Sequence, residues 1–124
     1  MRPHLLPATL VIGLLAPVID VTVQAHHSHA MFDLSKEVTL TGTISKVLFR
    51  NPHVMLILDV KGPDGQTVSW TVEMSTIEIE NRRGLTPSML KPGDVITVKL
   101  NPLRDGSKGG NYTSLTTADG KTFD

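Results

Sequence analysis

From residue 37 onward, hydrophobic and polar residues alternate along most of the chain, which is the period of half-buried β-strands. This pattern predicts five strands, over residues 37–49, 53–61, 66–74, 95–100 and 112–117. In the first strand the alternation changes phase between Ser45 and Val47. A phase change inside a long strand indicates a β-bulge, which bends a strand around a barrel.

A hairpin is predicted around Pro63-Asp64-Gly65, which fits a type I turn followed by a left-handed glycine. Counting back from this turn sets four apolar pairs opposite one another: Val60–Val68, Leu58–Trp70, Leu56–Val72 and Val54–Met74. The register predicts that all eight face inward, with Trp70 buried in the core. His53, Met55 and Glu73 then face outward.

A short helix is predicted after the third strand, because residues 75–78 fit a capping box with Ser75 as N-cap. It runs to Arg83, with Gly84 just past its end. The order is three strands, one helix and two strands, which is that of the OB-fold. The predicted fold class is therefore all-β, a small five-stranded OB-fold-like Greek-key barrel with one short helix between strands 3 and 4. Another small barrel is the alternative.

The first 25 residues have the pattern of a secretory signal peptide. Arg2 precedes an apolar run over residues 5–19, and Val23 and Ala25 suit the −3 and −1 positions of a cleavage site. An uncleaved anchor is the alternative, although the run is shorter than the roughly 20 residues of a membrane span. The predicted organisation is a signal peptide over 1–25, a His-rich N-terminal arm over 26–36 and a barrel domain over 37–124. Location outside the cytoplasm follows, periplasmic or secreted, with no stable membrane span after cleavage.

Charge and cysteine content narrow the choice of partners. The chain has 12 Lys and Arg against 12 Asp and Glu, so nothing electrostatic favours nucleic acid or an anionic membrane. It contains no cysteine, which excludes disulfides and thiolate metal sites.

Five short motifs follow one another along the chain: Ala25-His26-His27-Ser28, Leu40-Thr41-Gly42-Thr43-Ile44, Asn51-Pro52-His53, Trp70-Thr71-Val72-Glu73 and Leu90-Lys91-Pro92-Gly93-Asp94. In this order the chain resembles an uncharacterised family of short exported bacterial proteins, known only as a domain of unknown function. The resemblance implies a small exported β-barrel from a Gram-negative bacterium, and it implies no activity.

Histidines form the main concentration of reactive side chains. His26, His27 and His29 lie within four residues of the predicted mature terminus. The terminal amine, imidazoles and backbone amides are nitrogen ligands that suit Cu(II), Ni(II) or Zn(II), with copper favoured by the affinity order. The alternative is a solvated polar arm.

His53, on the outer face with Met55, is a fourth candidate ligand if the arm folds back; the alternative is an ordinary surface histidine. The carboxylates, Glu73 included, show no acid/base spacing and are interpreted as solvated strand positions. The serines lack a nucleophile motif. The sequence therefore predicts no enzyme.

The predicted function is a periplasmic, non-enzymatic binding protein that holds a transition metal, with copper (Cu2+) as the first choice. His26 and His27 are the predicted primary ligands, with His29 and His53 as helpers. One alternative is a small-ligand or protein-interaction module that binds through the barrel face and a loop over residues 101–110. Another is a copper enzyme in which His26 chelates through its amine and ring.

We expect the mature protein to begin at His26, because Val23 and Ala25 follow the apolar run at the spacing that signal peptidase requires. N-terminal sequencing of exported material checks this. Material that retains residues 1–25 would contradict both the cleavage and the use of the His26 amine as a ligand.

Overall fold

The computed structural model describes residues 29–124. Its elements are β1 (Val38–Leu48), β2 (Met55–Lys61), β3 (Thr67–Glu73), α2 (Ile77–Arg82), the 3-10 turn η1 (Pro87–Met89), β4 (Val95–Pro102), β5 (Gly109–Thr117) and β6 (Thr122–Phe123). The predicted signal peptide, His26 and His27 lie outside the described residues. Among residues 29–124, no helix is long and apolar enough to cross a membrane.

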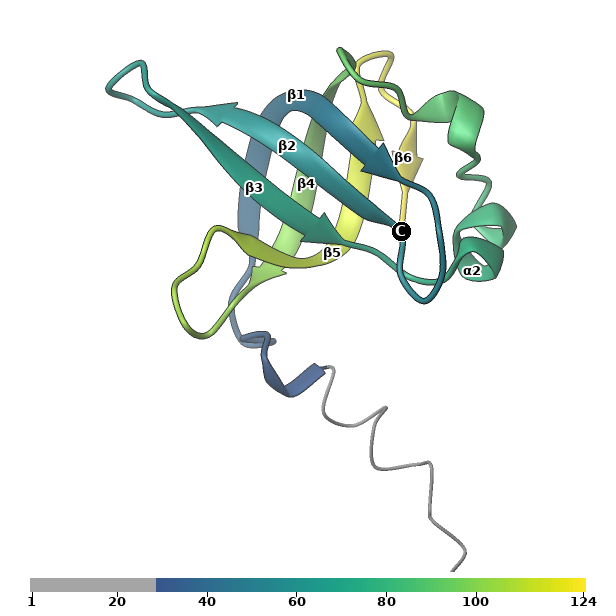
Figure 1. The fold of residues 1–124 in the computed structure, drawn as a ribbon, viewed down its shortest axis with the longest axis horizontal. Helices are drawn as coiled ribbons and strands as arrows, with labels where there is room; N and C mark the ends of the chain where they lie inside the picture. Colours follow the sequence, from purple (N-terminus) through teal and green to yellow (C-terminus); the bar gives the residue numbers. More distant parts are fainter. Residues whose placement is uncertain (1–28) are drawn as a thin grey trace, which may run out of the picture.

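The strands form one sheet that closes on itself (Figure 1). Its antiparallel order is β3-β2-β1-β4-β5-β6, and β3 also pairs in parallel with β5. This second pairing matches Thr71 with Gly109 and Glu73 with Asn111. The result is a closed barrel of β1 to β5 with α2 between β3 and β4, so the predicted OB-fold-like architecture is confirmed. The two-residue strand β6, which adds to β5, was not predicted.

The register of the β2–β3 hairpin agrees with the turn chemistry. Leu58 faces Trp70 and Leu56 faces Val72, as predicted. Gly65 has a φ of +79°, the left-handed conformation expected after the turn. The predicted bulge of β1 is also present, as a register shift between Ile44 and Lys46 against β2.

The predicted burial of Trp70 in the core is wrong. The indole is only partly buried and packs at the edge of the core, and Val68 is 37% exposed. The physical reason is that β5 pairs with β3 only from Thr71 onward, so the part of β3 that carries Val68 and Trp70 leaves the barrel closure toward the hairpin tip (Figure 1). The Lys108 ammonium lies over the Trp70 ring instead, 5.3 Å from its centroid.

The core is mainly aliphatic, because aromatic residues make up only 4% of the chain. All five barrel strands contribute buried side chains, and the segment between α2 and β4 adds two leucines. The buried hydrophobic residues of this cluster are Leu40, Ile44, Val54, Leu56, Leu58, Val72, Met74, Leu85, Leu90, Ile96, Val98, Leu100, Tyr112, Leu115 and Phe123.

The predicted loop over residues 101–110 is present but shorter, because only residues 103–108 lie between the two strands. β4 continues to Pro102, and β5 begins at Gly109, so that Gly109 and Gly110 are buried where the barrel closes. A Cβ on Gly110 would clash with the Asn101 carbonyl and lie 2.5 Å from the Leu100 side chain. The glycines therefore permit β5 to lie against both β3 and β4.

The described part of the N-terminal arm is attached to the barrel. Phe32 is 2% exposed and forms a β-bridge with Leu103. The Asp33 amide donates to the Pro102 carbonyl at 2.8 Å, and the Arg104 amide donates to the Met31 carbonyl at 2.9 Å. Residues 30–36 therefore do not form a solvated arm, because Phe32 buries its ring against the barrel.

We expect Gly110→Ala to lower the free energy of unfolding by about 1–3 kcal/mol, the usual effect of overpacking a closed site. Urea unfolding measures it. Gly62→Ala is the matched control, since its Cβ would meet only the flexible end of Asp64, 2.9 Å away. Equal stability of the two variants would contradict the tight closure.

Candidate functional site

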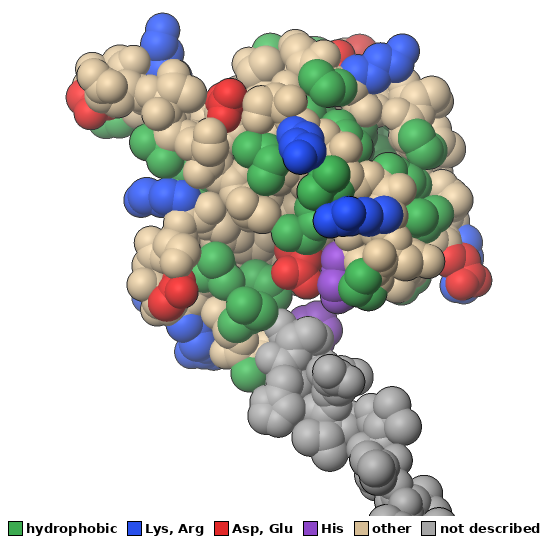
Figure 2. Space-filling model, viewed as in Figure 1, with side chains coloured by type: hydrophobic (Ala, Val, Ile, Leu, Met, Phe, Trp, Pro, Cys, Tyr) green, Lys and Arg blue, Asp and Glu red, His purple; other side chains and the backbone are tan. Residues whose placement is uncertain are grey.

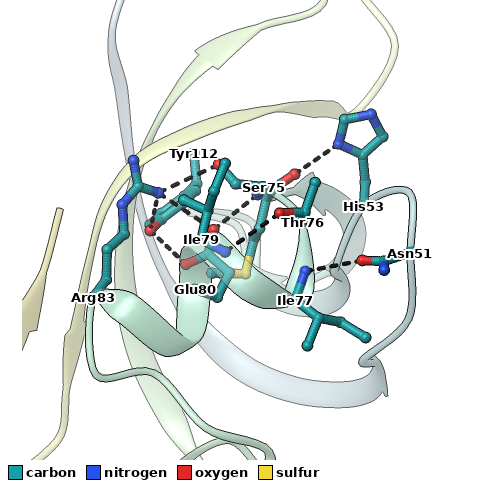
Figure 3. A network of polar contacts seen from close by, with 10 residues as sticks. Asn51, His53, Ser75, Thr76, Ile77, Ile79, Glu80, Arg83 and Tyr112 are labelled. Carbon is teal, nitrogen blue, oxygen red and sulfur yellow. Dashed lines mark hydrogen bonds and ion pairs between the residues drawn. The ribbon is translucent and has the colours of Figure 1, made fainter.

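His53 lies on the outer face of the barrel between the cis Asn51–Pro52 bond and β2. Its ring lies between two groups from the end of β3. Nδ1 is 3.1 Å from the Met74 carbonyl oxygen (Figure 3), and Nε2 is 3.5 Å from Oε1 of Glu73. The predicted outward orientation of His53 and Glu73 is confirmed by this contact.

The contact with Met74 fixes the tautomer of His53. A carbonyl oxygen can only accept a hydrogen bond, so Nδ1 carries the proton. Nε2 is then the nitrogen with a free lone pair in the neutral ring, and it is directed at the Glu73 carboxylate. This is the arrangement in which an imidazole can bind a metal through Nε2.

The backbone around His53 is tied to the start of α2. Val54 donates to the Ser75 carbonyl at 2.9 Å and accepts from the Met74 amide at 2.8 Å. On the other side of the bend, Oδ1 of Asn51 accepts from the Ile77 amide at 3.0 Å (Figure 3). His53 therefore sits on a short segment held at both ends.

The cap of α2 differs from the predicted one by one residue. Thr76 is the N-cap, and its hydroxyl accepts from the Ile79 amide at 3.3 Å. The reciprocal bond comes from Glu80, whose Oε1 accepts from the Ser75 amide at 2.8 Å. Glu80 is completely buried, so the structure assigns it a role that the sequence analysis missed.

Tyr112 and Arg83 complete the surroundings of this buried carboxylate (Figure 3). The Tyr112 hydroxyl donates to Oε2 of Glu80 at 2.9 Å and accepts from Nη1 of Arg83 at 2.9 Å. Nη1 of Arg83 is also 3.3 Å from Oε1 of Glu80. Burial, together with the hydrogen bond to Glu80, raises the pKa of Tyr112 to about 12.

This network supports the candidate site indirectly. It joins α2 to β5 and fixes the amide of Ser75, the residue that follows Met74. The Met74 carbonyl in turn orients the His53 ring. Glu80 lies four residues after the N-cap Thr76, one residue beyond the position that the capping-box pattern covers, so this pattern does not reveal it.

The four predicted metal ligands are only partly described. His29 is exposed at the start of the described chain, and His53 is half-buried. Figure 2 shows histidine side chains at the end of the domain where the described chain begins, one of them beside an acidic side chain. Within residues 29–124, no group of three or more His, Cys, Asp or Glu side chains could hold a metal ion.

His53 and Glu73 are thus a two-donor cluster that needs further ligands. Met55 pairs with Glu73 across the strands on the same outer face. Its thioether adds a soft donor type next to the imidazole and carboxylate. The structure brings Glu73 to His53, whereas the sequence analysis had placed it among solvated positions.

A groove lies at the far end of β5 from its pairing with Glu73. Its volume is about 340 Å³. It is lined by Met89, Asp94, Val95, Ile96, Thr117, Ala118, Asp119 and Lys121. Apolar walls with two carboxylates and one ammonium could hold a small amphipathic molecule.

Comparison with known proteins gives one family and one fold. A family of unknown function (DUF6152) matches residues 15–113. No curated protein matches the chain.

Two crystal forms of the mitochondrial single-stranded DNA binding protein Rim1 from S. cerevisiae are similar in structure. One form is 14% identical, with a TM-score of 0.50, and covers 69% of this chain and 97% of Rim1. The other is 10% identical, with a TM-score of 0.52, and covers 67% and 92%. At such identity the likeness shows the OB-like fold alone.

We expect the folded domain to lose up to about 3 kcal/mol of stability between pH 10 and about pH 12, since each pKa unit is worth about 1.4 kcal/mol. The pKa of Tyr112 is raised in the folded state, so its contribution is fully present below the unfolded value near 10 and is lost as pH rises toward 12.

Tyr112 is the only tyrosine, so the absorbance of ionised tyrosine follows it alone while urea unfolding is measured across this range. Tyr112→Phe is the control and should lose this component of the pH dependence. A midpoint near the ordinary value of 10 in the folded protein would show that the hydroxyl is not held by Glu80.

Proposed function

The chain belongs to the family of unknown function DUF6152, and we propose that it is an exported, non-enzymatic protein that binds a transition metal, copper(II) first. The proposed primary ligands are His26 and His27, with His29 and His53 as additional ligands. Export rests on the signal-like pattern of residues 1–25.

The observation that carries this proposal is the fixed tautomer of His53. Histidines that bind metals usually donate their second ring N–H to a carbonyl or carboxylate, which orients the ring. His53 has this bond to Met74, with Nε2 directed outward toward Glu73.

The attachment of the arm provides further support. Phe32 anchors the arm against Leu103, and three histidines lie three to six residues before this anchor, at His26, His27 and His29. Anchoring lowers the conformational entropy that a metal site on a free terminus would lose on binding. Nitrogen donors without thiolates favour copper(II) over the other common divalent ions.

A second candidate function is a small-ligand or protein-interaction module, favoured by the groove between β4 and the β5–β6 turn. Its volume of about 340 Å³ is within the range of small-molecule pockets. In that case the histidines are incidental, and the binding residues are those of the groove.

Nucleic-acid binding is a weaker proposal, although Rim1 is described as a single-stranded DNA binding protein. OB-folds take oligonucleotides on the outer face of strands 2 and 3. Here that face carries Asp59 and Glu73 beside Lys61, and the whole chain has no excess of basic residues. Phosphate binding requires such an excess.

We expect copper(II) to bind the protein that starts at His26 at least about tenfold more tightly than two altered forms. One form carries an extra residue before His26, which moves the amine out of chelating position. The other is the double variant His26→Ala/His27→Ala. Isothermal titration with copper(II) measures all three.

Ser28→Ala is the matched control, because it changes the arm without removing a nitrogen ligand. It should bind copper(II) like the unmodified protein. Equal affinity in all forms would remove the arm from the site and make the groove module the better proposal.

A further inference from the structure

The part of β3 nearest the hairpin tip has a free backbone edge. β2 pairs with one side of β3 from Thr67 onward, whereas β5 pairs with the other side only from Thr71 onward. Among residues 29–124, no strand covers this second side at residues 67–70. Figure 1 shows the hairpin tip projecting away from the other strands. A strand edge of this kind can pair with a strand of another chain.

Two hydrogen bonds fix the direction of the backbone groups along this edge. The Gln66 carbonyl accepts from an amide of the other arm of the hairpin at 2.8 Å, so Gln66 bonds toward β2. The Thr71 amide donates to the Lys108 carbonyl at 3.1 Å, so Thr71 bonds toward β5. Backbone groups alternate between the two sides along a strand. The amides and carbonyls of Thr67 and Ser69 therefore point to the free side.

The side chains of this edge do not protect it from pairing. Natural proteins usually block a free edge with charged residues, lysine above all, or with proline. Residues 67–72 are Thr, Val, Ser, Trp, Thr and Val, so none of them is charged and none is proline. Val68 is 37% exposed and lies on the apolar inner face of the hairpin, opposite Val60. A second strand on this edge would cover part of the Val68 side chain.

The free stretch is short, and its two ends select the kind of strand that fits it. It begins at Thr67, directly after the hairpin turn, and ends at Thr71, where the Lys108 carbonyl occupies the edge. A straight peptide that continued past Thr71 would collide with the loop over residues 103–108. A strand that turns away at this point avoids the loop. The hairpin of a second copy does so, because its own turn lies directly before its Thr67.

A twofold axis at Val68 sets two copies in register. Thr67 of each copy then faces Ser69 of the other, and each facing pair can exchange both of its backbone hydrogen bonds. Val68 faces Val68, so the apolar inner faces of the two hairpins become continuous. The tip of one hairpin, with the Asp64 carboxylate, then lies at Lys108 of the other copy. Opposite charges therefore meet at both ends of the paired stretch.

We infer that two copies of this chain associate through the free edge of β3, so that their β2–β3 hairpins form one continuous sheet. The contact is isologous, since the same residues of both copies take part in it. Only a short stretch pairs, so the interface is small and the dimer is of the weak, reversible kind. This inference goes beyond the proposed function, because the histidines have no part in the interface.

The chain has no cysteine, so a single introduced thiol reports this contact. Facing residues that exchange no hydrogen bonds have Cα atoms about 4.5 Å apart, within the roughly 4.4–6.8 Å that a disulfide spans. We expect Val68→Cys to form a disulfide-linked dimer at least about tenfold faster than Val95→Cys when both are oxidised with diamide. Val95 is the matched control, because it is a strand valine that is more exposed, at 48%. EDTA is present, so that metal ions cannot bridge two copies.

The protein without introduced cysteine provides the second measurement. Analytical ultracentrifugation should show a dimer whose share rises with concentration, and the exchange of the Thr67 and Ser69 amides should slow over the same range. Thr67→Pro removes one of these amides at the first residue of β3, a position where proline is tolerated. It should weaken dimerisation at least about tenfold, whereas Thr67→Ser keeps the amide and should dimerise unchanged. The NMR amide spectrum confirms that each variant is folded.

Three results would overturn the inference. The first is cross-linking of Val68→Cys no faster than that of Val95→Cys. The second is a dimer that Thr67→Pro leaves at full strength, which would place the contact elsewhere on the molecule. The third is a protein that stays monomeric at every concentration. If the Thr67 and Ser69 amides of such a monomer exchanged slowly, another segment of the same chain would cover the edge in place of a second copy.

Discussion

The parallel pairing of β3 with β5 is the constraint on which the rest of the structure depends. It involves only three residue pairs, from Thr71 with Gly109 to Glu73 with Asn111. Glycine at 109 lets β5 approach the Thr71 backbone of β3 closely, and glycine at 110 avoids a clash with the Asn101 carbonyl of β4. By closing the barrel, this pairing buries the inner face of five strands. It also sets the end of β3, the start of β5 and the anchored arm beside one another.

A buried polar network fixes the helix at that same end of the barrel. Burying an isolated carboxylate in an apolar core is strongly unfavourable unless hydrogen bonds replace its water. Glu80 receives them from the nearby Ser75 amide and Arg83 and from the Tyr112 hydroxyl, which lies 32 residues further along the chain. In a chain without disulfides, such a network specifies one position of α2. The bend that carries His53 is held rigidly by the same network.

The proposed metal ligands come from two parts of the chain, the barrel and the segment before Phe32. The barrel offers His53, beside Glu73, in fixed geometry, and the chain before Phe32 carries the remaining histidines. Binding geometry held by packed strands is more precise than geometry held by loops. The groove near Asp119 has no comparable convergence of metal ligands.

The sequence by itself determined the features that depend on near neighbours. Period-two alternation and the Pro63-Asp64-Gly65 turn fixed the pairing of Leu58 with Trp70, because hairpin register depends on local turn geometry. The bulge in β1 and the outward direction of His53 followed from the same counting. The strand and helix order then indicated an OB-like barrel.

Only the tertiary structure decided the contacts between distant segments. These are the closure of β3 on β5, the bond between Glu80 and Tyr112, and the docking of Phe32 on Leu103. The predicted face of Trp70 is correct, but its predicted burial is too high. Burial depends on how far the hairpin extends past its neighbours. Alternation reports which side of a strand is apolar; which segment covers that side depends on the packing of the whole chain.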